Sequence, residues 1–101
     1  MVVTLAEFTA STTKSAPPAG LSASLRGMWF AAKGDWHKAH GIVQDDDSAA
    51  AAWVHAYLHR VEGDLPNARY WYGVAGKAAA NGPPDAEWGA ITSVLLQPPS
   101  P

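Results

Sequence analysis

A glycine-aspartate pair occurs twice in this chain in the same surroundings, and this repeat limits the fold more than any other feature. Gly34-Asp35 and Gly63-Asp64 lie 29 residues apart. Glycine accepts the left-handed backbone conformation that closes a helix. Aspartate can then cap the next helix by accepting hydrogen bonds from its first free N–H groups. Each pair therefore indicates a tight turn between two helices.

The residues around the two turns also match in type. The segment Lys33–His40 aligns with Glu62–Arg69, and the apolar positions before each turn correspond, for example Trp29 with Leu58. A repeat of this length is typical of stacked helical hairpins. The sequence thus predicts two copies of one helix-turn-helix unit, with a chance pairing of two ordinary hairpins as the alternative.

Apolar spacing and capping residues place the expected helices. Val54, Leu58, Val61 and Leu65 follow a helical period and predict one apolar stripe. The expected helices run over residues 22–33, 35–44, 48–62, 65–76 and 86–96, with Asp85 as the cap of the last.

This pattern predicts a single all-α domain over residues 22–96, built from two helical hairpins and a C-terminal capping helix. The last helix would cover the open end of a two-repeat stack. We expect residues 1–21 to form an N-terminal arm and linker, with a short helix over 1–10 anchored by Leu5 and Phe8. Residues 97–101 are expected to be a disordered tail.

Composition excludes several classes of site and partner. The 101 residues include no cysteine, which rules out disulfides, thiolate metal sites and cysteine nucleophiles. The net charge is −2 without a cluster of Lys or Arg, so neither nucleic acid nor a membrane surface is expected as a partner. The chain lacks a signal-peptide pattern and any apolar run near the roughly 20 residues of a membrane span. We expect a cytoplasmic protein without a cofactor.

One face of the 48–62 helix carries candidate chemistry. His55, His59 and Glu62 are spaced i, i+4 and i+7 and so share a face. Two histidines one turn apart can reach one metal ion, and a carboxylate can complete the set. The helix of metalloproteases needs a glutamate directly after the first histidine, and Ala56 stands there. The side chains are therefore interpreted in three ways: as a hydrogen-bonded polar core, which we expect, as a pocket for a small ligand, or as a metal site, which we do not assign.

Residues of the helices on either side extend this candidate site. His40 occupies the repeat position of Arg69, and packing of the two hairpins could bring either toward the His55 face. Arg69 is also placed to pair with Glu62 or Asp64, while Tyr70 points away from the expected core. The candidate ligand-binding residues are His40, His55, His59, Glu62, Arg69 and Tyr70. No catalytic residue is assigned.

The two turns resemble those of the tetratricopeptide repeat, with an alanine five residues after each glycine (Ala39 and Ala68). The repeat-ending proline is absent, and the unit has 29 residues where the family has about 34. The resemblance implies tetratricopeptide-like hairpins, in which His55 and His59 would point inward between paired helices.

Residues 25–96 also resemble a group of small uncharacterised bacterial proteins. Their motifs AKGDW-x-x-AH, HAYLHR-x-EGD, NA-x-YWY and a closing EW helix are present here as 32–40, 55–64, 67–72 and Glu87-Trp88. Those proteins continue YWY with two arginines, whereas this chain has Gly73-Val74. The resemblance implies no function.

Two hypotheses of function follow. The first is a helical-repeat binding or scaffold module that contacts a protein partner or its own copy. The second is a protein that binds a small molecule or metal through His55, His59 and Glu62 with His40 or Arg69, with catalysis by a histidine base included. Nothing in the sequence requires an enzyme.

Overall fold

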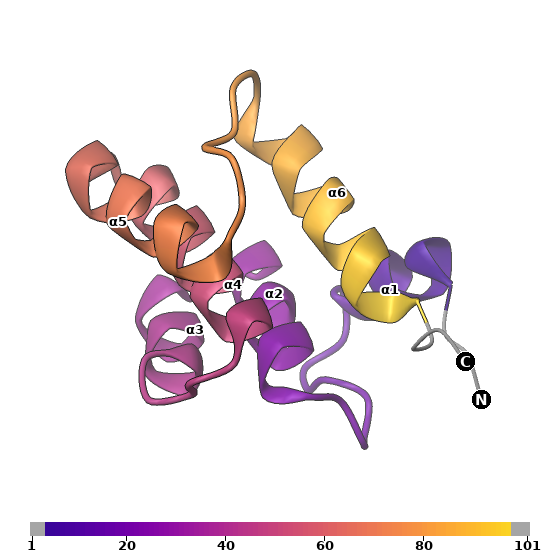
Figure 1. Ribbon diagram of the computed structural model, residues 1–101. Coiled ribbons are helices and arrows are strands. Elements are labelled where there is room, and N and C mark those ends of the chain that lie inside the picture. The colour runs from indigo at the N-terminus through magenta and orange to yellow at the C-terminus, as the bar shows by residue number, and fades with distance from the viewer. Residues whose placement is uncertain (1–3, 98–101) are drawn as a thin grey trace.

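The computed structural model describes residues 4–97 and is built from helices joined by short connections (Figure 1). The helices are α1 Leu5–Ser11, α2 Ala23–Ala32, α3 Trp36–Val43, α4 Ala49–Glu62, α5 Leu65–Ala75 and α6 Pro84–Leu96. No strand occurs between residues 4 and 97, so the predicted all-α class is confirmed. Within the same range, no helix has the length and apolar character needed to cross a membrane.

Most helix ends follow the capping chemistry of the sequence. The side chains of Ser22, Asp35, Ser48 and Asp64 cap α2 to α5, each accepting a hydrogen bond from a backbone N–H in the first turn. Gly63 closes α4 with a φ of 90°, a conformation that other residues rarely adopt.

The predicted cap of the last helix is wrong. Helix α6 begins at Pro84, its N-cap is Pro83, and no side chain caps it. Proline suits the first helical position, which Pro84 occupies, because its fixed φ is already helical and it has no N–H to leave unpaired. Asp85 lies inside the first turn instead.

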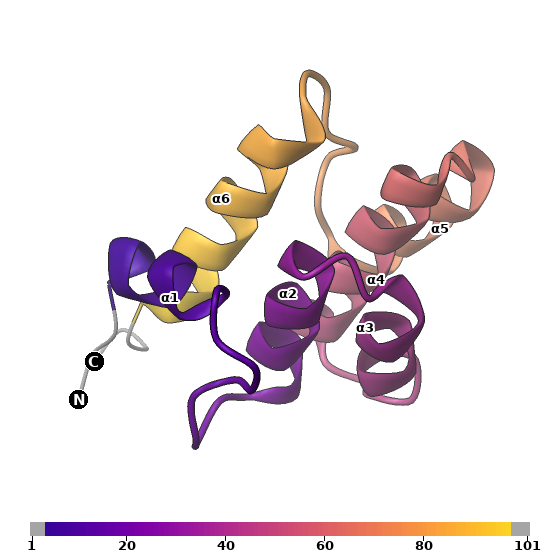
Figure 2. The same cartoon turned by 180° about the vertical axis from the view of Figure 1, so that it is seen from behind.

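Helix α4 is the centre of the molecule. Helices α2 and α3 form one hairpin, α4 and α5 form the other, and α4 also contacts α2, α3 and α6. Helix α6 diverges from the second hairpin and reaches α1 at its C-terminal end, as the two opposite views in Figures 1 and 2 agree. That the hairpins stack as tetratricopeptide repeats do stays a prediction.

The core lies where α2, α3, α4 and α6 meet. Its buried side chains include Met28, Val43, Val54, Leu58 and Ile91. A second cluster joins Phe8 of α1, fully buried, to Leu25 and Trp29 of α2. Helix α1 thus packs on the same body. Of the predicted tail, residues 98–101 lie outside the described residues.

The predicted stripe on α4 holds only in its first half. Val54 and Leu58 are buried, but Val61 and Leu65 are 48% and 50% exposed. Val61 belongs to the last turn of α4, and Leu65 opens α5 beyond the Gly63 turn. The helical spacing therefore predicts burial for Val54 and Leu58 but not for residues at and beyond the last turn of α4.

Candidate functional site

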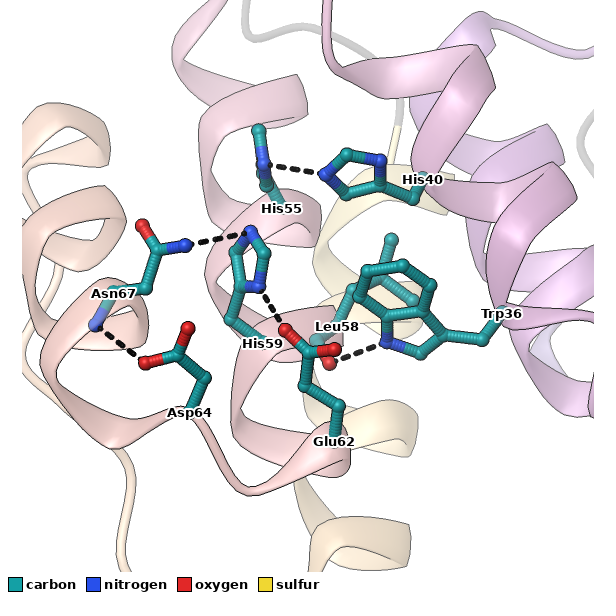
Figure 3. Close-up of polar contacts among 8 residues, drawn as sticks. All are labelled: Trp36, His40, His55, Leu58, His59, Glu62, Asp64 and Asn67. Atoms are coloured by element: carbon teal, nitrogen blue, oxygen red, sulfur yellow. Dashed lines mark hydrogen bonds and ion pairs between the residues drawn. The ribbon is translucent and has the colours of Figure 1, made fainter.

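Three histidines from two helices converge beside the core (Figure 3). His40 of α3 and His55 of α4 face each other, with their Nε2 atoms 3.1 Å apart. His59 lies one turn beyond His55 on α4, and its ring stacks on that of His55 at a centroid distance of 4.8 Å. One nitrogen from each of the three rings lies within 4.8 Å of the other two. The cluster thus joins the two hairpins through side-chain nitrogens.

The partners of His59 determine which of its nitrogens carries the proton. Its Nδ1 lies 2.5 Å from Oε1 of Glu62, and its Nε2 lies 3.3 Å from Nδ2 of Asn67 on α5. A carboxylate accepts and an amide NH2 donates, so Nδ1–H donates to Glu62 and Nε2 accepts from Asn67. The single in-plane lone pair of Nε2 is therefore directed at Asn67 (Figure 3).

Two tryptophans enclose the cluster from opposite hairpins. The ring of Trp36 stacks on His40 at 4.7 Å, and Trp71 stacks on His55 at 4.0 Å. The indole Nε1–H of Trp36 donates to the backbone carbonyl of Leu58 at 2.6 Å, which ties α3 to α4. His55 and His59 are only 5% and 6% exposed as a result, whereas His40 is half-buried.

Burial and mutual repulsion favour the neutral form of His40 and His55 by lowering the pKa of each. Burial, followed by the charges that His40 and His59 would carry, lowers the pKa of His55 to about 4. The pKa of His40 is also lowered, first by burial and then by His59, while Glu62 opposes the shift. Neutral imidazole is the form that offers a lone pair to a metal ion.

The structure brings together four of the six residues proposed from the sequence. His40, His55, His59 and Glu62 are joined by the contacts above, and Glu62 lies at the exposed rim. Arg69 is exposed and forms no ion pair with any residue between 4 and 97, because Glu62 is bonded to His59 and Asp64 caps α5. Tyr70 is exposed, and its ring packs edge-on to Trp71 rather than to a histidine.

Asn67, Trp36 and Trp71 also belong to this cluster, although the sequence did not predict it. Trp36 and Asn67 follow the two Gly-Asp turns, and each occupies the first turn of its helix. Their distance from the histidines depends on how the hairpins pack, which the repeat does not specify. The one available signal was position: Trp36 is one turn before His40 on the same helix, close enough for their rings to stack.

A second polar network joins α4, α5 and α6. Arg60 donates to Oε1 of the buried Glu87 at 2.8 Å, and the hydroxyl of Tyr72 donates to the other carboxylate oxygen. Arg60 also donates to the backbone carbonyl of Gly82. Burial, followed by the hydrogen bond and charge of Glu87, raises the pKa of Tyr72. These contacts attach α6 to the second hairpin, so their role is in the fold.

Comparison with known proteins adds no relative. No family model, no curated protein and no solved structure matches this chain.

Proposed function

We propose that this protein binds a divalent transition-metal ion through His40, His55 and His59. The observation that carries the proposal is that one ring nitrogen from each of three histidines, supplied by two hairpins, lies within 4.8 Å of the other two. Imidazole nitrogen suits zinc, nickel, cobalt and copper, whereas calcium and magnesium require oxygen ligands. The chain has no cysteine to supply a softer ligand.

The spacing of two of the nitrogens, those of His40 and His55, fits such an ion. A zinc–nitrogen bond is about 2.0–2.1 Å, so two nitrogens on a tetrahedral ion lie roughly 3.3 Å apart. The two Nε2 atoms of His40 and His55 are separated by 3.1 Å. One of these two Nε2 atoms carries the proton of the hydrogen bond between the rings. If both nitrogens bind the ion, this proton moves to Nδ1 of the ring that carried it.

Glu62 and Asn67 determine how His59 would bind the ion. Histidines that bind a metal through one nitrogen commonly donate the other N–H to a carboxylate, which orients the ring and increases its basicity. Glu62 makes this contact with His59. The ion would replace Asn67 as the partner of Nε2, so that the amide of Asn67 turns away.

The test compares metal binding by the wild type and two kinds of variant. After treatment with a chelator and its removal, Zn2+, Ni2+ and Co2+ are added and followed by calorimetry and thermal melting. An ion at about one hundred times its Kd stabilises the fold by roughly 2.7 kcal/mol, an increase in Tm of ten degrees or more for a domain of this size. In the visible spectrum, Co2+ bands would report the coordination geometry.

Matched variants separate the cluster from ordinary histidine binding. His59→Gln and His40→Gln should reduce metal affinity at least tenfold. His37→Gln should leave it unchanged, since His37 is exposed on the same helix as His40 and is not in the cluster. Wild-type protein that shows no binding and no change of Tm with any of the three ions would refute the proposal and support a hydrogen-bonded polar core. The hypothesis of a protein-binding or self-associating module stays a prediction.

A further inference from the structure

A cleft that the metal proposal does not use lies between α6 and the segment that follows α5. Its volume is about 320 Å³. The lining residues are Trp53, Lys77, Ala78, Ala80, Asn81, Ala86, Glu87, Ala90 and Ile91. In Figures 1 and 2 the chain leaves α5, runs out to the start of α6 and returns along a helix that diverges from the hairpin.

Small side chains on both walls keep this cleft open. Ala78 and Ala80 stand on the segment after α5, while Ala86 and Ala90 stand one turn apart on α6. The bonds of Glu87 to Arg60 and Tyr72 hold α6 in place against the second hairpin. The walls are therefore fixed by contacts beside the cleft and not by side chains that fill it.

The cleft offers a ligand one aromatic side chain, Trp53, and one cationic side chain, Lys77. Trp53 of α4 is half-buried, and Nζ of Lys77 lies 4.4 Å from the centre of its ring. Lys77 forms no ion pair with any carboxylate between residues 4 and 97. Glu87 lines the cleft, but both of its oxygens already accept hydrogen bonds, so its charge is balanced by Arg60.

We propose that this cleft binds a small planar aromatic anion, such as an aromatic carboxylate. The ring would pack on Trp53 where the ammonium of Lys77 now lies, and the ammonium would move off the indole to pair with the carboxylate. Offset stacking of aromatic rings and a charge-assisted hydrogen bond are each favourable in a partly desolvated site. A volume of about 320 Å³ is near the lower end of small-molecule sites and fits one or two fused rings.

The probe is 2-naphthoate, added to the full chain labelled with 15N, with chelator present throughout. The amide signals of residues 77–81 and 86–91 and the indole N–H of Trp53 should shift, whereas those of His40 and its neighbours should not. Lys77→Met should weaken binding about tenfold, because Lys77 is the one cation among the described residues that line the cleft. The chelator separates this result from the metal proposal, which can fail or succeed independently.

A matched lysine and a blocked cleft complete the test. Lys33 also lies over a tryptophan, with Nζ 5.4 Å from the ring of Trp29, but it does not line the cleft. Lys33→Met should therefore bind as the wild type does, and Ala90→Leu should abolish binding by filling the space. Either of two results overturns the proposal: no shifts with millimolar 2-naphthoate, or equal affinity for 2-naphthoate and uncharged 2-naphthamide in both the wild type and Lys77→Met.

Discussion

At the scale of single residues, His55 links the polar cluster to the pH dependence of stability. Burial lowers its pKa to about 4 in the folded chain, whereas an exposed histidine has a pKa near 6.5. Between these two values the unfolded chain binds more protons than the folded one. The free energy of unfolding therefore decreases as the pH falls from about 6.5 toward about 4. Neighbouring groups act in the same cluster: His40 and His59 repel a proton at His55, while Glu62 attracts one at His40.

We expect the free energy of unfolding to be about 2 kcal/mol lower near pH 5 than near pH 7.5, as a shift of this size implies. Urea unfolding at the two pH values, with chelator present, measures the difference. In His55→Gln most of the dependence should disappear, since glutamine occupies a similar volume and does not titrate. The same slope in wild type and variant would show that other groups cause it. An NMR titration of the His55 ring would then give a pKa near 6.5.

The four residues of the cluster could be foreseen because two kinds of sequence information coincide there. The i, i+4 and i+7 spacing on α4 places His55, His59 and Glu62 on one face. The 29-residue repeat aligns His40 with Arg69, so the sequence proposed both residues as candidates for the site. Only packing distinguishes these two: α3 lies against the His55 face, and Arg69 on α5 remains in solvent. Position in a repeat predicts a helix face but not the partner of that face.

At the scale of helices, Gly27 of α2 marks a close approach to α3 and α4. A Cβ atom at this position would lie 2.9 Å from Cγ1 of Val43 on α3 and 3.2 Å from Cγ1 of Val54 on α4. Both distances are shorter than ordinary van der Waals contact, and valine side chains have few other rotamers in a helix. The absence of a side chain at Gly27 thus lets three helices meet.

Gly27→Ala should lower the free energy of unfolding by about 1 kcal/mol or more, because overpacking outweighs the better helix propensity of alanine. The control is Gly89→Ala in α6, where an added Cβ meets nothing within 4 Å. That variant should be stabilised by about 0.5–1 kcal/mol. Chemical unfolding of both proteins gives the comparison. Stabilisation by Gly27→Ala would mean that Val43 and Val54 move apart without cost.

At the scale of the whole molecule, the sequence predicted the hairpins better than their surroundings. Turns and caps depend on neighbouring residues, so the ends of α2 to α5 followed from local patterns. The docking of α6 depends on pairs far apart in the chain. Arg60 and Glu87 are 27 residues apart, and Trp88 donates to the carbonyl of Met28, 60 residues away. No local pattern marks such partners.

The pair of Arg60 and Glu87 tests how α6 is attached to the second hairpin. Their side chains are 13% and 6% exposed, so removing one charge leaves the other poorly solvated. Arg60→Met should therefore lower the free energy of unfolding by about 2–3 kcal/mol, somewhat less than for a fully buried pair. The double variant Arg60→Met/Glu87→Gln should recover at least half of this loss, because glutamine carries no charge and still accepts a hydrogen bond from Tyr72. Urea unfolding of the two single variants and the double variant measures the coupling between the sites. Strictly additive losses would show that Arg60 and Glu87 are not coupled, and that each acts through its other partner, Gly82 for Arg60 and Tyr72 for Glu87.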